Sequence, residues 1–420
     1  MRCPAPSLPK LRGTPVAVAL KSPIVGAARG MGMIDRRSLM RTSGLGLAGL
    51  AMSLPGRAQS AFAPRPALVP VDARAERLMR ISVCLRPFRA AGPRIEMERI
   101  AGRHVIHHYG HGGSGWSLSW GSAMQAAPLA LTAGAREVAV VGAGAIGLTT
   151  ALTAQRLGLK VVIYAAERFP DVRSARATGT WSPFSRIAMA GAVAAGFADR
   201  WEQMARRSWA IYQSYLGRAG TPVEFLERYV LFDANTPPYR PEPVALPGGG
   251  SDHFVDYEER LRDISPRNQT LGPDQHPFPV AVARRNHSMN FNVSALAATL
   301  EQEFLLNGGR FVPMTLASPA DFGRIRERVI FNCTGYGARA LLRDESIIPV
   351  RGQIAWLPPQ PEVRYGLYYR DVSMLPRPDG IVVQAIGASE AFGFNDANEA
   401  PDVAAARSSV EVIASLFRPR

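Results

Sequence analysis

Apolar residues along this chain fall into short runs separated by glycine-rich turns, a pattern typical of buried strands alternating with helices. The runs are too short to be helices and therefore predict strands at residues 81–85, 104–109, 137–141, 160–164, 329–332 and several times within 351–395. Longer amphipathic or small-residue stretches predict helices at residues 72–79, 121–132, 144–157, 201–218, 293–307 and 402–417. This alternation predicts an α/β fold.

One part of this pattern forms a complete strand–helix–strand unit at residues 137–164. Between its first strand and its helix lies the series Gly142, Ala143, Gly144, Ala145, Ile146, Gly147. Glycines at this spacing allow a tight turn, the approach of a pyrophosphate to the backbone, and close packing of helix on strand. Glu167 follows the second strand, where an acid can accept ribose hydroxyls. The unit predicts a bound dinucleotide, although an ordinary strand–helix turn is the plain alternative and the motif does not separate NAD from FAD.

Charge adds little to this picture. The chain has 420 residues, enough for two domains, and a formal net charge of +15. Residues 1–60 hold nine Lys or Arg and one acidic residue, so only +7 remains in the rest of the chain. No basic run interleaved with aromatic residues is present, which argues against a nucleic-acid partner.

The first 60 residues resemble a leader. Arg36 and Arg37 form a twin-arginine pattern, followed by an apolar stretch at 44–54 and small residues at 58–63. The apolar stretch is too short for a membrane span, so no stable membrane insertion is expected. We expect export by the twin-arginine route to a periplasmic or secreted location. A disordered arm with two chance arginines is the alternative.

Cysteines and histidines supply two further candidates. After the leader only Cys84 and Cys333 remain, both in apolar runs, and two buried thiols are favoured over one disulfide. Four of the seven histidines fall within residues 104–111. Their spacing matches no zinc motif, and strand alternation directs His107 and His108 to opposite faces, so no metal site is expected.

Five separated motifs then point to one family. They are Arg86-Pro87, the glycine loop at residues 108–113, and the segments 174–181, 331–335 and 350–353. Together with the fingerprint they resemble the D-amino-acid oxidase family of FAD enzymes over most of residues 81–390, weakly at 183–290. The resemblance implies FAD as cofactor, a Rossmann-like FAD-binding domain, and an α+β substrate domain with a mixed or antiparallel sheet.

The order of the motifs differs from that family. There the fingerprint opens the chain, whereas here the Arg-Pro and glycine-loop segments precede it, which suggests a circular permutation with 133–136 as the new link. Tandem fusion is disfavoured because no segment occurs twice. We expect a leader at 1–60, a discontinuous FAD-binding domain at 85–182 and 286–350, and a substrate domain at 65–84, 183–285 and 351–420.

The resemblance also implies roles for residues. Arg86 would hold the substrate carboxylate, the Gly113 carbonyl would accept a hydrogen bond from the amine, and Tyr369 would be an active-site tyrosine, with Tyr365 and Tyr368 as rivals. Ser373 stands where the family has a second tyrosine. The expected cofactor-binding residues are Gly112, Gly113, Ser114, Gly115, Trp116, Ser117, Gly142, Ala143, Gly144, Ala145, Ile146, Gly147, Glu167, Arg168, Ser174, Thr178, Gly179, Thr180, Thr334 and Gly335.

The reaction that the resemblance implies is oxidative deamination. A D-amino acid would lose hydride to the flavin, its imine would hydrolyse to a 2-oxo acid and ammonia, and oxygen would be reduced to hydrogen peroxide. A dehydrogenase using another electron acceptor and a flavin-binding protein without turnover are the alternatives. The expected partners are the D-amino acid and oxygen, with a homodimer as a further possibility.

Overall fold

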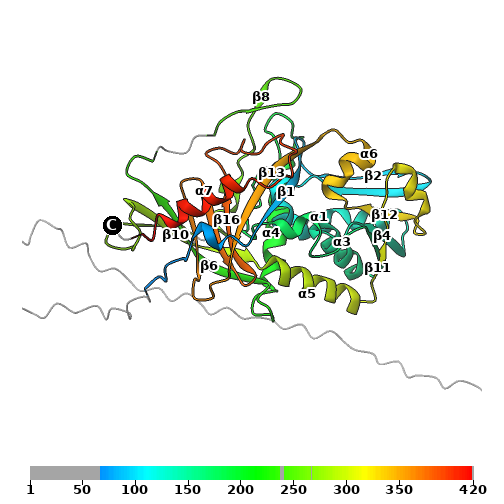
Figure 1. Cartoon of the computed structure of the whole chain (residues 1–420). Helices are drawn as coiled ribbons and strands as arrows, with labels where there is room; N and C mark the ends of the chain where they lie inside the picture. The colour runs from blue at the N-terminus through cyan, green and yellow to red at the C-terminus, as the bar shows by residue number, and fades with distance from the viewer. Residues whose placement is uncertain (1–66, 237–240, 266, 419–420) are drawn as a thin grey trace, which may run out of the picture. The chain divides into compact units, whose positions relative to one another are not determined.

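The computed structural model describes residues 67–236, 241–265 and 267–418 (Figure 1). The leader expected at 1–60, with its twin arginines, lies outside these residues. The described residues form one compact unit. Within the described residues, no helix is both long and apolar enough to span a membrane.

A six-stranded sheet forms one side of the unit, in the order β11-β5-β4-β12-β3-β2. All neighbours pair in parallel except β2, which runs antiparallel to β3 at the edge. The bounds predicted for β4 and β12 are confirmed exactly, whereas β2 was not predicted. The strands are β2 (Arg94–Ile100), β3 (Arg103–Tyr109), β4 (Glu137–Val141), β5 (Lys160–Ala165), β11 (Arg310–Pro313) and β12 (Val329–Asn332).

Helices rich in small residues pack beside this sheet. α1 contacts both α3 and α4, and α3 contacts α5. A Cβ at Gly121 would overlap the backbone of Met204, so the glycine allows α1 and α4 to cross closely. Trp120, Leu148 and Phe304 are fully buried in this core. The helices are α1 (Gly115–Ala126), α2 (Pro128–Thr132), α3 (Ala145–Arg156), α4 (Phe197–Gln213), α5 (Val293–Leu306) and, elsewhere, α6 (Ala338–Leu342).

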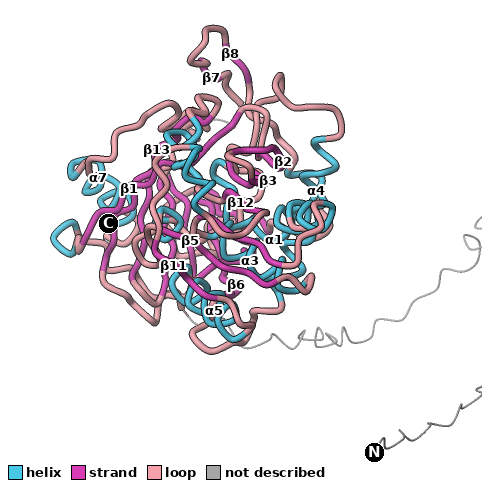
Figure 2. The backbone as a smooth tube through the Cα atoms, turned by 90° about the vertical axis from the view of Figure 1, so that its right-hand side faces the viewer, coloured by secondary structure: helices cyan, strands magenta, loops and turns pink. Residues whose placement is uncertain are grey.

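An eight-stranded sheet forms the other side, in the order β1-β13-β16-β15-β14-β6-β10-β9. It is antiparallel except for the parallel pair β14 and β6. α7 (Val403–Ala414) packs on β13, β15 and β16. The strands are β1 (Arg80–Arg89), β6 (Val223–Phe232), β9 (Gln269–Leu271), β10 (Val282–Phe291), β13 (Ile347–Leu357), β14 (Tyr365–Tyr369), β15 (Val372–Arg377) and β16 (Gly380–Ala385). A small hairpin of β7 (Val244–Ala245) and β8 (Ser251–Asp252) projects from the unit (Figure 2).

Elements that precede the fingerprint in sequence are integral to both sheets. β1 pairs with β13 along its full length, and β3 lies between β12 and β2. α2 ends at Thr132 and β4 begins at Glu137, so four residues join the early segment to the fingerprint strand. The expected boundaries at 84/85 and 285/286 fall inside β1 and β10, which both belong to the eight-stranded sheet.

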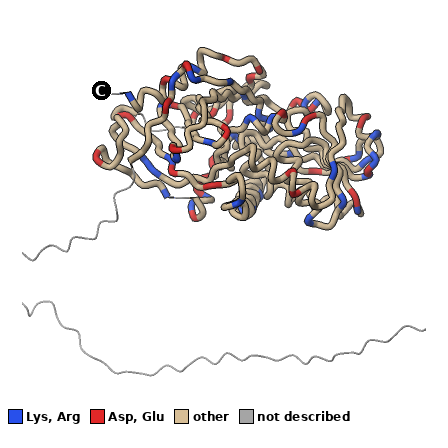
Figure 3. The backbone as a smooth tube through the Cα atoms, turned by 60° about the horizontal axis from the view of Figure 1, so that its bottom comes forward, with Lys and Arg blue, Asp and Glu red and all other residues tan. Residues whose placement is uncertain are grey.

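Charged residues are distributed over the whole unit. Figure 3 shows basic and acidic positions interspersed along the described backbone rather than gathered by sign. Many form exposed pairs, such as Arg206 with Asp263 and Arg260 with Asp199.

Candidate active site

A cavity of about 900 Å³ is lined by residues of both sheets. One part of its wall is the glycine fingerprint at the carboxyl end of β4, joined by Glu167, Ser174, Thr178 to Thr180, Thr334 and Gly335. We call this part the cofactor end. The other part, the substrate end, is lined from the eight-stranded sheet by Arg86, Arg228, Tyr368, Ser373 and Gln384.

The fingerprint forms a backbone cradle. Gly142 has φ +105°, and a Cβ there would lie 2.6 Å from the Cys333 carbonyl oxygen. A Cβ at Gly147 would overlap the carbonyl of Gly142. α3 begins directly after this turn, and the amide of Ala145 donates to Ser174 Oγ at 3.0 Å. The positive end of a 12-residue helix therefore lies at the cavity, an arrangement suited to a pyrophosphate.

Glu167 lines the cavity just beyond β5, where a ribose would lie beside the cradle. Arg168, expected beside it, does not line the cavity. Its guanidinium lies 2.5 Å from Glu301 and stacks 3.9 Å from the Phe311 ring. We therefore withdraw Arg168 as a cofactor ligand, because its charge is already paired on the outer side of the fold.

The second glycine loop closes the cavity from another side. Gly112 has φ +54°, and a Cβ there would overlap the Arg186 carbonyl, while a Cβ at Gly113 would lie 2.7 Å from Ser185 Oγ. The two glycines therefore allow this loop to pack closely against Ser185 and Arg186, which also line the cavity. Ser114, expected to contact the cofactor, is fully buried and donates to the Ser185 carbonyl at 2.9 Å instead. Gly115, Trp116 and Ser117 do line the cavity.

Two histidines lie behind this loop. His108 contacts Thr150 Oγ1 at 2.8 Å and Ser122 Oγ at 2.9 Å, and His111 contacts the same Ser122 oxygen at 3.0 Å. Burial lowers the pKa of His111 to about 3 and that of His108 well below its ordinary value. Both rings are therefore neutral near pH 7. Among the described residues, no group of histidine, cysteine and acidic side chains is arranged to hold a metal ion.

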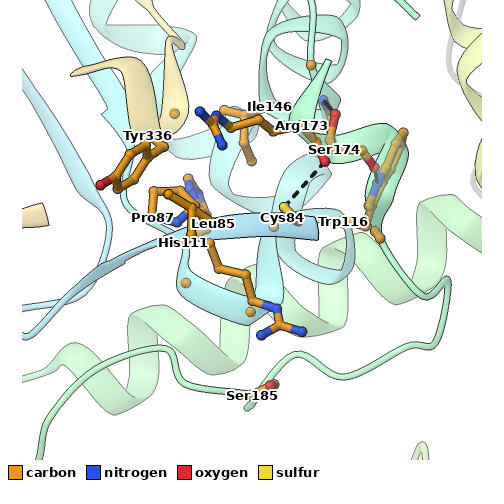
Figure 4. Close-up of a pocket in the computed structure, with 18 of the residues that line it drawn as sticks. Cys84, Leu85, Pro87, His111, Trp116, Ile146, Arg173, Ser174, Ser185 and Tyr336 are labelled. Carbon is orange, nitrogen blue, oxygen red and sulfur yellow. Dashed lines mark hydrogen bonds between the residues drawn. The ribbon is translucent and has the colours of Figure 1, made fainter. Parts of the chain in front are cut away.

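β1 contributes four consecutive residues to the cavity wall, Arg86 and its neighbours Cys84, Leu85 and Pro87. Cys84, Leu85 and Pro87 lie together in Figure 4, where the Cys84 thiol donates to the Arg173 carbonyl at 3.5 Å. Cys84 and Cys333 are both free thiols, as the apolar runs predicted. Burial raises the pKa of both, to about 12 for Cys333, so neither is a thiolate near neutral pH.

Arg86 faces the cavity with little to balance its charge. Its guanidinium donates to the Arg351 carbonyl at 3.3 Å, and no carboxylate of the described residues lies within ion-pair distance. Burial lowers its pKa from the ordinary value. A Cβ at Gly352, the β13 partner of Cys84, would overlap the Arg86 guanidinium, so that glycine leaves the room in which Arg86 lies.

The structure corrects the expectation for Tyr369. Side chains alternate along β14, and Tyr369 lies on the face of the sheet away from the cavity, where its hydroxyl donates to Asp233 Oδ1 at 3.1 Å. Its neighbour Tyr368, a rival in the sequence, lines the cavity. Ser373 is buried, lines the cavity and pairs with Tyr368 across β14 and β15.

Several cavity residues have no motif in the sequence. Arg228 and Gln384 reach the cavity from β6 and β16, and Gln384 accepts a short hydrogen bond from Thr178. Arg186, Glu258 and Glu390 line it from loops and a short 3-10 turn. The chain between residues 183 and 290 gave only a weak pattern, and no signal in it identified Arg228.

Comparison with known proteins adds family evidence. The family model described as FAD dependent oxidoreductase (DAO) matches residues 137–420, beginning at the first residue of β4. A D-amino-acid oxidase of Streptomyces coelicolor is 27% identical over 278 residues, which is 64% of this chain and 75% of that protein. A D-aspartate oxidase of Talaromyces thermophilus is 55% identical over 47 residues, 11% of this chain and 13% of that protein. An L-amino acid deaminase structure from Proteus vulgaris has TM-score 0.43 and 13% identity, covering 67% of this chain and 75% of that one.

Proposed function

Because this chain belongs to the FAD-dependent oxidoreductase family and binds FAD, we propose that it oxidises D-amino acids to 2-oxo acids and ammonia, with oxygen reduced to hydrogen peroxide. The family match establishes that the chain is an FAD-dependent oxidoreductase, whereas the D-amino acid substrate and the oxygen acceptor are proposed. The 27% identity to a D-amino-acid oxidase supports that choice.

The observation that carries the proposal is Arg86. A guanidinium that lines the cavity without a carboxylate partner suits the carboxylate of an amino acid, because its planar fork pairs both oxygens. Gly113 lines the same cavity, and its carbonyl would accept a hydrogen bond from the substrate amine. These two groups would fix the orientation of the Cα–H bond that is broken.

The cofactor end fits FAD. The cradle of Gly142 and Gly147, the N-terminus of α3 and Glu167 would hold the pyrophosphate and ribose. Bound FAD supplies the redox chemistry by accepting two electrons from the substrate. The chain's own part is to orient the substrate, keep Arg86 charged, and exclude water from the reacting carbon.

The test is anaerobic flavin reduction by a panel of D- and L-amino acids, followed by peroxide assay in air against reduction of an artificial acceptor. Reduction by D-amino acids with peroxide formation supports the proposal. Reduction without peroxide indicates a dehydrogenase, and no reduction by any amino acid indicates a flavin-binding protein without turnover.

A variant locates the site. Arg86→Gln is expected to raise KM for the amino acid by about a hundredfold or more, because a buried charge-assisted pair is lost, while FAD stays bound. Arg364→Gln is the matched control, since that arginine is 74% exposed and pairs with Glu224 on the surface. An unchanged KM in Arg86→Gln would remove Arg86 as the carboxylate ligand.

We also propose that the chain is circularly permuted. The family match begins at β4. β3 comes before β4 in the sequence, yet it lies within the same six-stranded sheet, between β12 and β2. Near the other end of the chain, α7 packs against the 3-10 turn Ala75–Arg77. A reordered chain, residues 137–418 followed through a short linker by 67–136, is expected to bind FAD and to unfold at a similar temperature. An insoluble or flavin-free product would oppose the idea.

Export of the folded protein by the twin-arginine route remains a proposal from Arg36 and Arg37. Replacing both with lysine is expected to hold a leader–reporter fusion in the cytoplasm. A reporter that still reaches the outside would contradict it.

A further inference from the structure

The substrate end holds a second arginine that the reaction described above does not use. Arg228 projects from β6 into the cavity that Arg86 lines from β1. Its strand neighbour on β14 is Gly366, where a Cβ would lie 3.8 Å from Arg228 Cγ. Tyr368, two residues further along β14, lines the same part of the wall.

The Arg228 guanidinium has no partner of opposite charge at close range. Among the described residues it forms no hydrogen bond and no ion pair, in contrast to the surface arginines. Its pKa is lowered, chiefly by burial, and the groups that act on it are the more distant Tyr368 and Glu258. Glu258 also lines the cavity and attracts Arg228, but the two side chains are not within ion-pair distance, and burial raises the pKa of the Glu258 carboxyl.

The other arginines that line the cavity have acceptors, since Arg173 pairs with Glu399 and Arg176 donates to the Val83 carbonyl. Arg186 donates through Nε to the Glu390 carbonyl at 2.7 Å, and the two side chains attract one another. Asp256 accepts the Glu258 amide at 3.1 Å and is exposed. Two cations, Arg86 and Arg228, are therefore left facing one cavity without a bound carboxylate.

Leaving two guanidinium groups partly desolvated and unpaired in one cavity is unfavourable, because desolvation of each costs free energy and like charges repel. A ligand with two carboxylates would relieve both effects, since each planar fork can pair two oxygens. We propose that Arg228 binds a second, side-chain carboxylate, so that the preferred substrate is a dicarboxylic amino acid. The inference rests on the proposed amino-acid oxidation at this site.

The sheet indicates how such a substrate would lie. β13, β16, β15 and β14 separate β1 from β6, so the two arginines enter from opposite sides of the cavity. Gln384, Ser373 and Tyr368 line the wall between them. The substrate would span this polar floor, with its α-carboxylate at Arg86 and its side-chain carboxylate at Arg228.

Binding of substrate-like acids to the FAD-loaded enzyme tests this directly. Dissociation constants for malonate, succinate, glutarate and adipate, each against the monocarboxylate of equal length, are measured by the change in flavin absorbance. At least one dicarboxylate is expected to bind about tenfold or more tightly than its monocarboxylate, and the best length reports the separation of the two guanidiniums. No advantage at any length overturns the proposal without any variant.

Variants of Arg228 test whether this residue causes the tighter binding of dicarboxylates. Arg228→Gln is expected to abolish it while leaving monocarboxylate binding within about twofold, and Arg228→Lys is expected to keep part of it. Arg364→Gln is the surface control. A dicarboxylate advantage that persists in Arg228→Gln overturns the assignment.

Turnover measurements distinguish a failure of this inference from a failure of the proposed function. Anaerobic flavin reduction should be faster at low substrate with D-aspartate or D-glutamate than with D-asparagine or D-glutamine. Turnover of neutral D-amino acids without an acidic preference refutes the inference alone. A preference for D-lysine that Glu258→Gln removes would assign the site to a cation instead. If no amino acid reduces the flavin, the proposed function fails, and dicarboxylate binding still decides the role of Arg228.

Discussion

The two ends of the cavity are built from different parts of the polypeptide. The cofactor end consists mainly of backbone, where glycines such as Gly142 and Gly147 allow amides and carbonyls to approach a ligand. The substrate end consists of side chains, including Arg86, Arg228 and Tyr368, from strands far apart in sequence. Backbone recognition uses consecutive residues and leaves a motif, whereas Arg228 and Tyr368 reach the cavity through the order of strands in a sheet and stand in no motif.

The largest effect is expected at the cofactor end. Gly147→Val would drive a side chain into the Gly142 carbonyl, separating α3 from β4 and closing the cradle. We expect FAD binding to weaken by more than about a hundredfold, measured by flavin retained after gel filtration and by titration of the stripped protein. Gly248→Ala is the control, because a Cβ there meets nothing within 4 Å. Full flavin content in Gly147→Val would show that the cradle does not depend on this contact.

The next largest effect concerns the pH dependence of stability, which is expected to depend on the buried His111 and not on the arginines of the substrate end. The folded-state pKa of His111, about 3, lies below the unfolded value of about 6.5, so the unfolded chain binds more protons below that value. Stability is therefore full above about pH 6.5 and falls as the pH drops, by about 1.4 kcal/mol per unit for each such histidine. The arginines of the substrate end stay charged throughout this range.

His111→Asn removes one of these titrations. Comparing urea unfolding at pH 7 and pH 5, we expect the variant to lose about 2 kcal/mol less stability than the unmodified chain. Gly248→Ala, which changes an open position and no titrating group, is the control. Equal pH dependence in His111→Asn would mean that this ring is not held neutral.

A glycine at the substrate end gives a smaller effect of another kind. Gly352→Ala would push on the Arg86 guanidinium without touching the cradle. We expect KM for the amino acid to rise about tenfold with flavin content unchanged, because only the position of one charged fork is disturbed. Loss of flavin in this variant would break the separation between the two ends.

The smallest effect is expected for Tyr369→Phe, which removes the hydrogen bond to Asp233 on the far face of the sheet. Stability should fall by about 1 kcal/mol or less and kinetics should not change. Tyr368→Phe, one residue earlier, alters the cavity wall and should change substrate KM instead. Kinetic loss in Tyr369→Phe alone would restore the original expectation for that residue.

The sequence by itself determined the cofactor end. Its strand–helix–strand periodicity predicted β4 and β12 to the residue, and glycine spacing located the cradle, because local backbone geometry is encoded by consecutive residues. The family resemblance of the Arg-Pro motif pointed to Arg86, which lines the cavity in the structure. The side-chain positions of several single residues, in contrast, became clear only from the tertiary structure. Strand alternation put Tyr368 at the cavity and Tyr369 behind it, and an outer ion pair removed Arg168. The order β1-β13-β16-β15-β14-β6 brought Arg228 to the same cavity as Arg86. Such positions depend on register and on which strands become neighbours, and contacts between residues more than a hundred positions apart leave no periodic trace in one sequence.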